Sequence, residues 1–105
     1  MFQRLTLPQL EAFLKLDATA SFRDAALESG VSQPAFSRTI QRIEARIGVR
    51  LFDRDTRHVR LTAAGERLRP IAVRLLKDYE DSFSDFEAYV GGRAGRVRVA
   101  TLPSV

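Results

Sequence analysis

A short run of the chain combines the side-chain types that read nucleic acids. It holds hydroxyl, amide, guanidinium and small side chains: Ser32, Gln33, Pro34, Ala35, Ser37, Arg38, Gln41 and Arg42. Gln pairs with adenine, Arg with guanine, and Ser with phosphate or either base type, while Pro and Ala allow close approach or touch a thymine methyl group. An ordinary solvated helix face is the alternative. We interpret this run as a candidate DNA-reading surface.

A second group of arginines follows in the segment 50–60, namely Arg50, Arg54, Arg57 and Arg60. Arginine near the tip of a hairpin can enter a minor groove or hold a phosphate, which makes Arg54 and Arg57 candidate DNA contacts. Arg54 has an alternative structural role, because it could pair with Asp53, with Asp55 or with a helix terminus.

The charge distribution suits a nucleic-acid partner. The 105 residues carry 17 Lys and Arg against 13 Asp and Glu, and only Lys15 and Lys77 are Lys. The segment 32–69 holds nine Arg against four acids, whereas 78–87 holds five acids and no base. One basic stretch indicates an anionic partner, although an Arg-rich solvated surface explains the charge equally well.

Several function classes are excluded by composition. Cys is absent and His58 is the only His, which excludes a disulfide framework, a thiolate or His-rich metal site, and a cysteine nucleophile. No phosphate-binding glycine loop or other catalytic signature occurs. No apolar run approaches the roughly 18 residues of a membrane span. We therefore predict a cytoplasmic protein with no catalytic residue, no metal, no cofactor and no membrane partner.

Local signals predict three helices before the arginine-rich segment, at 7–17, 22–29 and 33–47. Their caps are Thr6, Ser21 and Ser32, and the stops are Gly30 and Gly48. Only Gly30, Val31 and Ser32 separate the second helix from the third, which is the layout of a helix-turn-helix with Val31 filling the turn.

The third helix is strongly amphipathic. Its apolar stripe consists of Phe36, Ile40, Ile43 and Ile47. At about 100° per residue, the opposite face carries Pro34, Ser37, Arg38, Gln41 and Ala45, with Arg42 at its edge. The candidate reading residues therefore face outward.

Two further elements complete the predicted fold. The segments 51–54 and 59–62 are short enough for strands of a hairpin, or wing, and Thr62 can cap a long helix that Gly91 and Gly92 end. Residues 96–102 alternate as a strand does. The predicted fold is mainly α, with a winged helix-turn-helix domain at 1–62, a linker and dimerisation helix at 63–90, and a hinge with the first strand of a further domain at 91–105.

The long helix has more apolar surface than a domain of this size can cover. Its apolar residues at helical spacings are Leu68, Ala72, Leu75, Leu76, Tyr79, Phe83, Phe86 and Val90. Small domains bury only about 60% of their unfolded surface, so a partner for this stripe would also relieve a marginal core. We predict that the stripe is a homodimer interface, with packing inside the monomer as the alternative.

A set of positions between Leu5 and Leu76 forms a specific pattern: Ser21-Phe22, Ala25-Ala26, Ser32-Gln33-Pro34-Ala35, Ser37, Ile40, Ile43-Glu44, Gly48, Leu51-Phe52, Arg54, Leu61-Thr62 and Ala64-Gly65. This pattern resembles the LysR-type transcriptional regulators. The resemblance implies a winged helix-turn-helix, a dimerising linker helix and a C-terminal effector domain like a periplasmic binding protein, of which only the first strand would remain here. It also implies base and phosphate contacts at 32–35, Ser37 and Arg38, with wing contacts near Arg54 and Arg57.

The sequence thus predicts a transcriptional regulator that binds double-stranded DNA as a homodimer on an inverted-repeat operator. A higher oligomer of the full-length parent stays open, and a small-molecule effector is expected only through the missing C-terminal domain. The competing hypothesis is a dimeric protein-interaction adaptor that has a winged-helix fold but does not bind DNA. Salt-dependent binding to duplex DNA separates the two.

Overall fold

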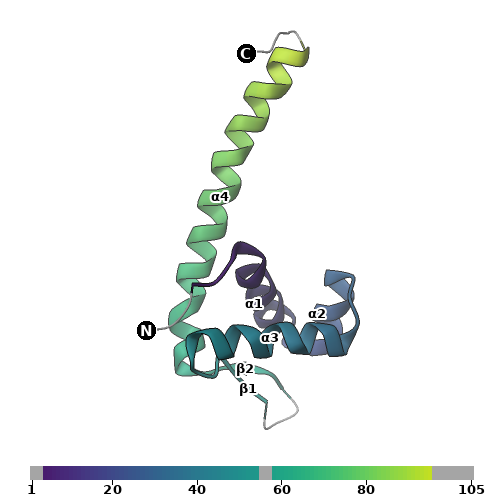
Figure 1. The fold of residues 1–105 in the computed structure, drawn as a ribbon, viewed down its shortest axis with the longest axis vertical. Coiled ribbons are helices and arrows are strands. Elements are labelled where there is room, and N and C mark those ends of the chain that lie inside the picture. The colour runs from purple at the N-terminus through teal and green to yellow at the C-terminus, as the bar shows by residue number, and fades with distance from the viewer. Residues whose placement is uncertain (1–3, 55–57, 96–105) are drawn as a thin grey trace.

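The computed structural model describes residues 4–54 and 58–95. Its elements, in chain order, are α1 (Leu7–Thr19), α2 (Phe22–Ser29), α3 (Gln33–Ile47), β1 (Phe52–Asp53), β2 (Arg60–Leu61) and α4 (Ala63–Gly95). The first three helices and the hairpin, together called the head, lie at one end of α4, and α4 extends far beyond them (Figure 1). The mainly helical winged helix-turn-helix predicted from the sequence is confirmed.

Side-chain caps start each helix of the head, as the sequence predicts. Thr6 and Gln9 form a reciprocal capping box, and the hydroxyls of Ser21 and Ser32 accept hydrogen bonds from the amides of Asp24 and Ala35. The helix α1 ends later than Asp17, at Thr19, because Ala20 takes the left-handed conformation (φ 54°) and its amide donates to the Leu16 carbonyl.

One hydrophobic core joins the elements of the head to α4. Its buried residues are Leu10, Phe13, Leu16, Ala25, Ala26, Phe36, Ile40, Ile43, Leu51, Phe52 and Ala72. The rings of Phe13 in α1 and Phe52 in β1 lie 5.4 Å apart, so the hairpin is anchored on α1. The two strands pair antiparallel, with Phe52 opposite Leu61 and Asp53 opposite Arg60.

The predicted end of the long helix at Gly91 and Gly92 is wrong, because α4 continues to Gly95. Glycine ends a helix by taking a left-handed conformation, and among the described residues only Gly30 and Gly48 are glycines with positive φ. A glycine inside a helix lowers the stability of the helix by only about 1 kcal/mol relative to alanine, so two adjacent glycines can remain helical. The predicted strand at 96–102 lies outside the described residues. None of the described helices is long and apolar enough to cross a membrane.

Candidate nucleic-acid interface

The predicted reading face of α3 is a solvent face. Phe36, Ile40 and Ile43 are buried against α1 and α2. On the other side, Ser32, Gln33, Pro34, Arg38, Gln41 and Arg42 are exposed, and Ala35 and Ser37 are half-buried. The predicted orientation of the helix is therefore confirmed.

The two arginines of this face are available to an external partner. Arg38 and Arg42 make no hydrogen bond or ion pair with any other residue of the described part of the chain. Their guanidinium groups present several donors each, which suit guanine edges and phosphate oxygens.

The turn between α2 and α3 is fixed by its backbone. Gly30 has φ 71°, and the Val31 amide donates to the Ala26 carbonyl over 3.1 Å. Val31 does not fill the turn as predicted, since its side chain is 46% exposed. The hydrogen bond and the glycine close the turn without it, and they place the first turn of α3 at the surface.

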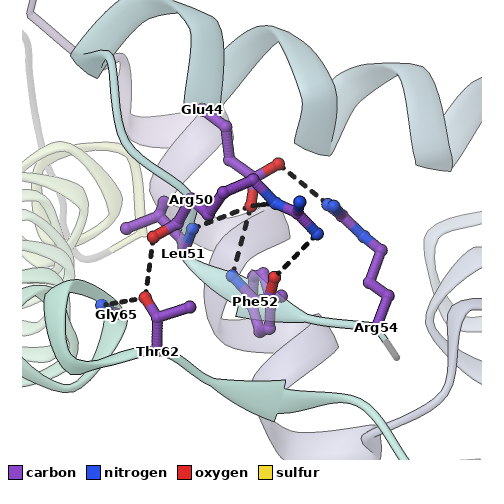
Figure 2. Close-up of polar contacts among 7 residues, drawn as sticks. All are labelled: Glu44, Arg50, Leu51, Phe52, Arg54, Thr62 and Gly65. Carbon is purple, nitrogen blue, oxygen red and sulfur yellow. Dashed lines mark hydrogen bonds and ion pairs between the residues drawn. The ribbon is translucent and has the colours of Figure 1, made fainter. Parts of the chain in front are cut away.

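A buried carboxylate joins α3 to the hairpin. Glu44 of α3 is 8% exposed, and its Oε2 accepts hydrogen bonds from the backbone amides of Leu51 at 2.8 Å and Phe52 at 3.2 Å (Figure 2). Its Oε1 lies 2.9 Å from Nη2 of Arg54, which donates to it. The carboxylate thus receives three donors from the segment that begins the wing.

The side chain of Arg54 turns back into the head. Besides the ion pair with Glu44, its guanidinium carbon lies 5.4 Å from the centre of the Phe22 ring in α2. Its side chain is 27% exposed, whereas that of Arg50 is 61% exposed and keeps its Nε 4.0 Å from the same carboxylate. The structural partners that the sequence offered for Arg54 were Asp53, Asp55 or a helix terminus; within the described residues its acceptor is Glu44, ten positions away. A DNA contact by Arg54 stays a prediction.

The wing and α4 share one residue at their junction. Thr62 Oγ1 donates to the Arg50 carbonyl at 2.7 Å and accepts from the Gly65 amide at 3.1 Å, so it caps α4 as predicted. The Thr62 amide also donates to the Leu51 carbonyl at 2.9 Å. Figure 2 shows Thr62 between the strand and the first turn of α4.

The remaining cations of the wing are only partly described. Arg60 and His58 are exposed. Arg57, the predicted contact at the hairpin turn, lies outside the described residues. Among the described residues, no group of three or more His, Asp or Glu side chains could hold a metal ion.

The predicted interface stripe of α4 divides into two halves. Beside the head, Ala72 is fully buried and Leu68 and Leu76 are half-buried. The other members are exposed, by 44% for Leu75 and, beyond the head, by 46% for Tyr79, 48% for Phe83, 57% for Phe86 and 46% for Val90. The assignment of Ala72 to a dimer interface is wrong: its small side chain lies in the monomer core where α4 contacts α1, next to the ion pair of Arg69 with Asp17 at 3.4 Å. Two further exposed apolar residues of α4, which the sequence did not single out, are Ile71 beside the head (44% exposed) and Tyr89 beyond it (55%).

Glu44 is the residue of this region whose role sequence reasoning missed. A signal was present, because Glu44 stands four residues after Ile40 and three before Ile47, on the apolar side of an amphipathic helix. A lone carboxylate at such a position needs a cation and other donors close by.

Comparison with known proteins identifies the family. Residues 7–66 match the bacterial regulatory helix-turn-helix proteins of the lysR family. The match spans α1, α2, α3, the hairpin and the first turn of α4. The chain belongs to this family. Its LysR-type winged helix-turn-helix is the fold of the DNA-binding domains of these transcriptional regulators.

Three similar proteins show the extent of the likeness. An uncharacterized HTH-type regulator of Azotobacter vinelandii is 40% identical over 97 residues, which are 92% of this LysR-family chain and 67% of the relative. The regulator YbhD of Escherichia coli is 36% identical over 98 residues, 93% of this chain but 31% of YbhD. The crystal structure of the BenM_DBD/benA site 1 DNA complex matches with a TM-score of 0.78 and 30% identity, over 84% of this chain and 99% of that one. The chain thus spans about a third of the length of YbhD.

Proposed function

We propose that this chain is the DNA-binding and dimerising part of a LysR-type transcriptional regulator that recognises an inverted-repeat operator in duplex DNA. The observation that carries the proposal is the exposed polar face at the start of α3, with two arginines unpaired within the described residues, directly after a tight turn. Such a helix fits the major groove, and its first turn presents backbone amides to phosphates.

The likeness to the BenM_DBD/benA site 1 DNA complex supports this proposal, since 84% of the chain superposes on a protein named in a DNA complex. The proposed base and phosphate contacts are Ser32, Gln33, Pro34, Ala35, Ser37, Arg38, Gln41 and Arg42. The wing would lie over the backbone or the minor groove, and Arg57 is its proposed contact.

We infer that the active form is a homodimer joined through α4. The side of α4 that the head covers at Ala72 continues beyond the head as Tyr79, Phe83 and Phe86, about half of whose surface is exposed. A contiguous exposed apolar stripe on a helix indicates a protein partner. A second copy would pack its own stripe against that of the first, so one symmetric contact would bury the apolar surface of both chains.

The charges beside this stripe favour an antiparallel pair. Arg67, Arg74, Asp78 and Asp85 stand at spacings of seven, four and seven, so they share one edge of α4. In an antiparallel pair, the same edges of the two helices meet. Arg67 would face Asp85 of the second copy and Arg74 would face Asp78, and both pairs are centred on residue 76. A parallel pair would instead place these edges on opposite sides, where their opposite charges could not pair.

An apolar groove lies where such a partner helix would pass. It is lined mainly by apolar side chains from the end of α3 and the first turns of α4, including Ile47, Val49, Leu68 and Ile71. In an antiparallel pair centred on residue 76, position 83 of one copy lies opposite position 69 of the other. The partner's aromatic residues therefore reach this groove. The groove and the exposed aromatic half of α4 are therefore complementary parts of one symmetric interface.

The same register supports an inverted repeat as the proposed operator. Ala63 lies 13 residues before the centre, so the starts of the two α4 helices would stand about 39 Å apart. One turn of DNA measures roughly 34–36 Å, so two heads related by a two-fold axis can enter successive major grooves on one face. The whole regulator, with an effector domain after α4 and a cytoplasmic location, is proposed from the family.

Selection from random-sequence duplexes tests the proposal. We expect the wild-type chain to enrich an inverted repeat and to bind it with a strong salt dependence. Arg38→Ala should weaken this binding by about 1 to 3 kcal/mol and narrow the preference over random DNA. Arg46→Ala removes the same charge from the last turn of α3 and should affect both DNAs equally.

Two results would contradict parts of this proposal. If Arg38→Ala lowered the affinity for operator and random DNA equally, Arg38 would contact only a phosphate and read no base. An absence of any salt-dependent binding by the wild-type chain would favour the adaptor hypothesis.

A further inference from the structure

We infer that Glu44 and Arg54 are a positioning pair for DNA binding. The carboxylate keeps the Arg54 guanidinium inside the protein, and the pair fixes the wing against α2 and α3. This inference rests on the proposed DNA binding. It gives Arg54 a role different from the phosphate contact that the sequence predicted.

The first support is the donor set of Glu44. A buried carboxylate is stable only when hydrogen bonds and a cation replace its hydration. Glu44 obtains two backbone amides, at 2.8 and 3.2 Å, and the guanidinium of Arg54 at 2.9 Å. All three donors come from the segment 51–54, so one side chain of α3 determines where the wing leaves the head.

The second support is the set of partners of Arg54. Its guanidinium contacts the Glu44 carboxylate and the Phe22 ring, which belong to two helices of the helix-turn-helix (Figure 2 shows the carboxylate contact). If Arg54 moved to a phosphate, Glu44 would lose its closest cation while remaining 8% exposed. Arg38 and Arg42 carry no such penalty, because within the described residues they have no partner to leave.

The third support is electrostatic. A carboxylate beside a DNA-binding surface repels phosphates unless a cation neutralises it. Arg54 provides this neutralisation, since it is much closer to Glu44 than Arg50 is, at 2.9 Å against 4.0 Å. The pair as a whole is neutral toward DNA, and its contribution to binding is geometric.

Salt titrations of DNA binding test the inference. Each lost phosphate contact reduces the magnitude of the slope of log K against log salt, here called the salt slope, by about 0.9. We compare the wild type with Arg54→Met, which keeps an apolar stem on Phe22, and with Glu44→Gln, which keeps the shape and an acceptor. Arg42→Met is the matched control, because it removes the charge of an exposed arginine on the reading face.

The expected results differ between the variants. Arg54→Met should reduce the preference for the selected operator over random DNA on the order of tenfold, and its unneutralised Glu44 should weaken binding to both DNAs. Glu44→Gln should release Arg54, so the slope should rise by about 0.9 and random DNA should bind more tightly. Arg42→Met should lower the slope by about 0.9. The double variant Glu44→Gln/Arg54→Met should return the slope to that of the wild type.

The double variant also serves if Arg54→Met fails to fold, because it leaves no buried unpaired charge. Circular dichroism and thermal unfolding establish which variants are folded. A salt slope lowered by about 0.9 in the folded double variant, which lacks both Arg54 and the Glu44 charge, would overturn the inference, because Arg54 would then contact a phosphate. An unchanged operator preference in both single variants would overturn it too. A wild-type chain that binds no DNA would contradict the proposed function instead.

Discussion

Gly65, in the first turn of α4, lies directly against the carbonyl oxygen of Leu51. A Cβ atom at position 65 would overlap this oxygen and would also crowd the Leu61 side chain. The carbonyl cannot move aside freely, because it accepts the hydrogen bond of the Thr62 amide. The close approach of α4 to the wing therefore requires glycine at this position.

Gly65→Ala should destabilise the head by about 1 to 3 kcal/mol, the usual range for overpacking a fixed site. The control is Gly91→Ala, also within α4, where nothing lies within 4 Å of the added methyl group. It should be neutral or stabilise the helix by about 0.5 to 1 kcal/mol. Urea unfolding of both variants measures the difference, and equal stabilities would contradict the packing at Gly65.

Arg57 should contribute to DNA binding through its charge. We expect Arg57→Ala to weaken binding to all sequences alike and to lower the salt slope by about 0.9. Arg57→Lys keeps the charge and should keep the slope. An unchanged slope in the alanine variant would remove Arg57 from the set of phosphate contacts.

Leu75→Asp should produce monomers. The substitution places a charge without a partner in the proposed interface of each copy, while Leu75 lies outside the core cluster of the head. Val73→Asp is the control, since Val73 is similarly exposed (49% against 44%) but lies about 200° around the helix. Analytical ultracentrifugation should show monomers only for Leu75→Asp. A wild-type chain that is monomeric at high concentration would contradict the dimer itself.

The orientation of the two α4 helices can be measured by cross-linking, because the chain has no cysteine. A mixture of Arg67→Cys and Asp85→Cys should form a disulfide between the two variants under mild oxidation. Each variant alone should remain uncross-linked, since an antiparallel pair separates equal positions far from residue 76. Failure of the mixture to cross-link, with a wild-type chain that dimerises, would contradict the antiparallel pair.

The helices of the head could be predicted because their boundaries are local. Ser21 and Ser32 start helices through their own hydroxyls, and Gly30 and Gly48 end them through left-handed backbone. The continuation of α4 through Gly91 could not be read from glycine content, because glycine tolerates both helical and left-handed conformations.

The candidate site was predictable only in part, because some of its contacts depend on how distant segments pack together. The outward face of α3 follows from helical periodicity, so Arg38 and Gln41 could be placed on it. The pairing of Arg54 with Glu44 depends on how the hairpin folds back on α3, and nearby Asp53 offered an equally plausible partner in the sequence. Burial of Ala72 likewise depends on where α4 crosses α1.

The continuous apolar side of α4 constrains how the length of this helix can change. Its buried part at Ala72 and its exposed part at Phe83 lie on one side of a helix with about 3.6 residues per turn. One residue inserted between them would rotate the exposed part by about 100° relative to the head and misalign the two heads of a dimer. Insertion of seven residues would keep this alignment nearly intact and lengthen the helix by about 10 Å. Natural or engineered length variants of α4 should therefore differ by near-integral numbers of helical turns.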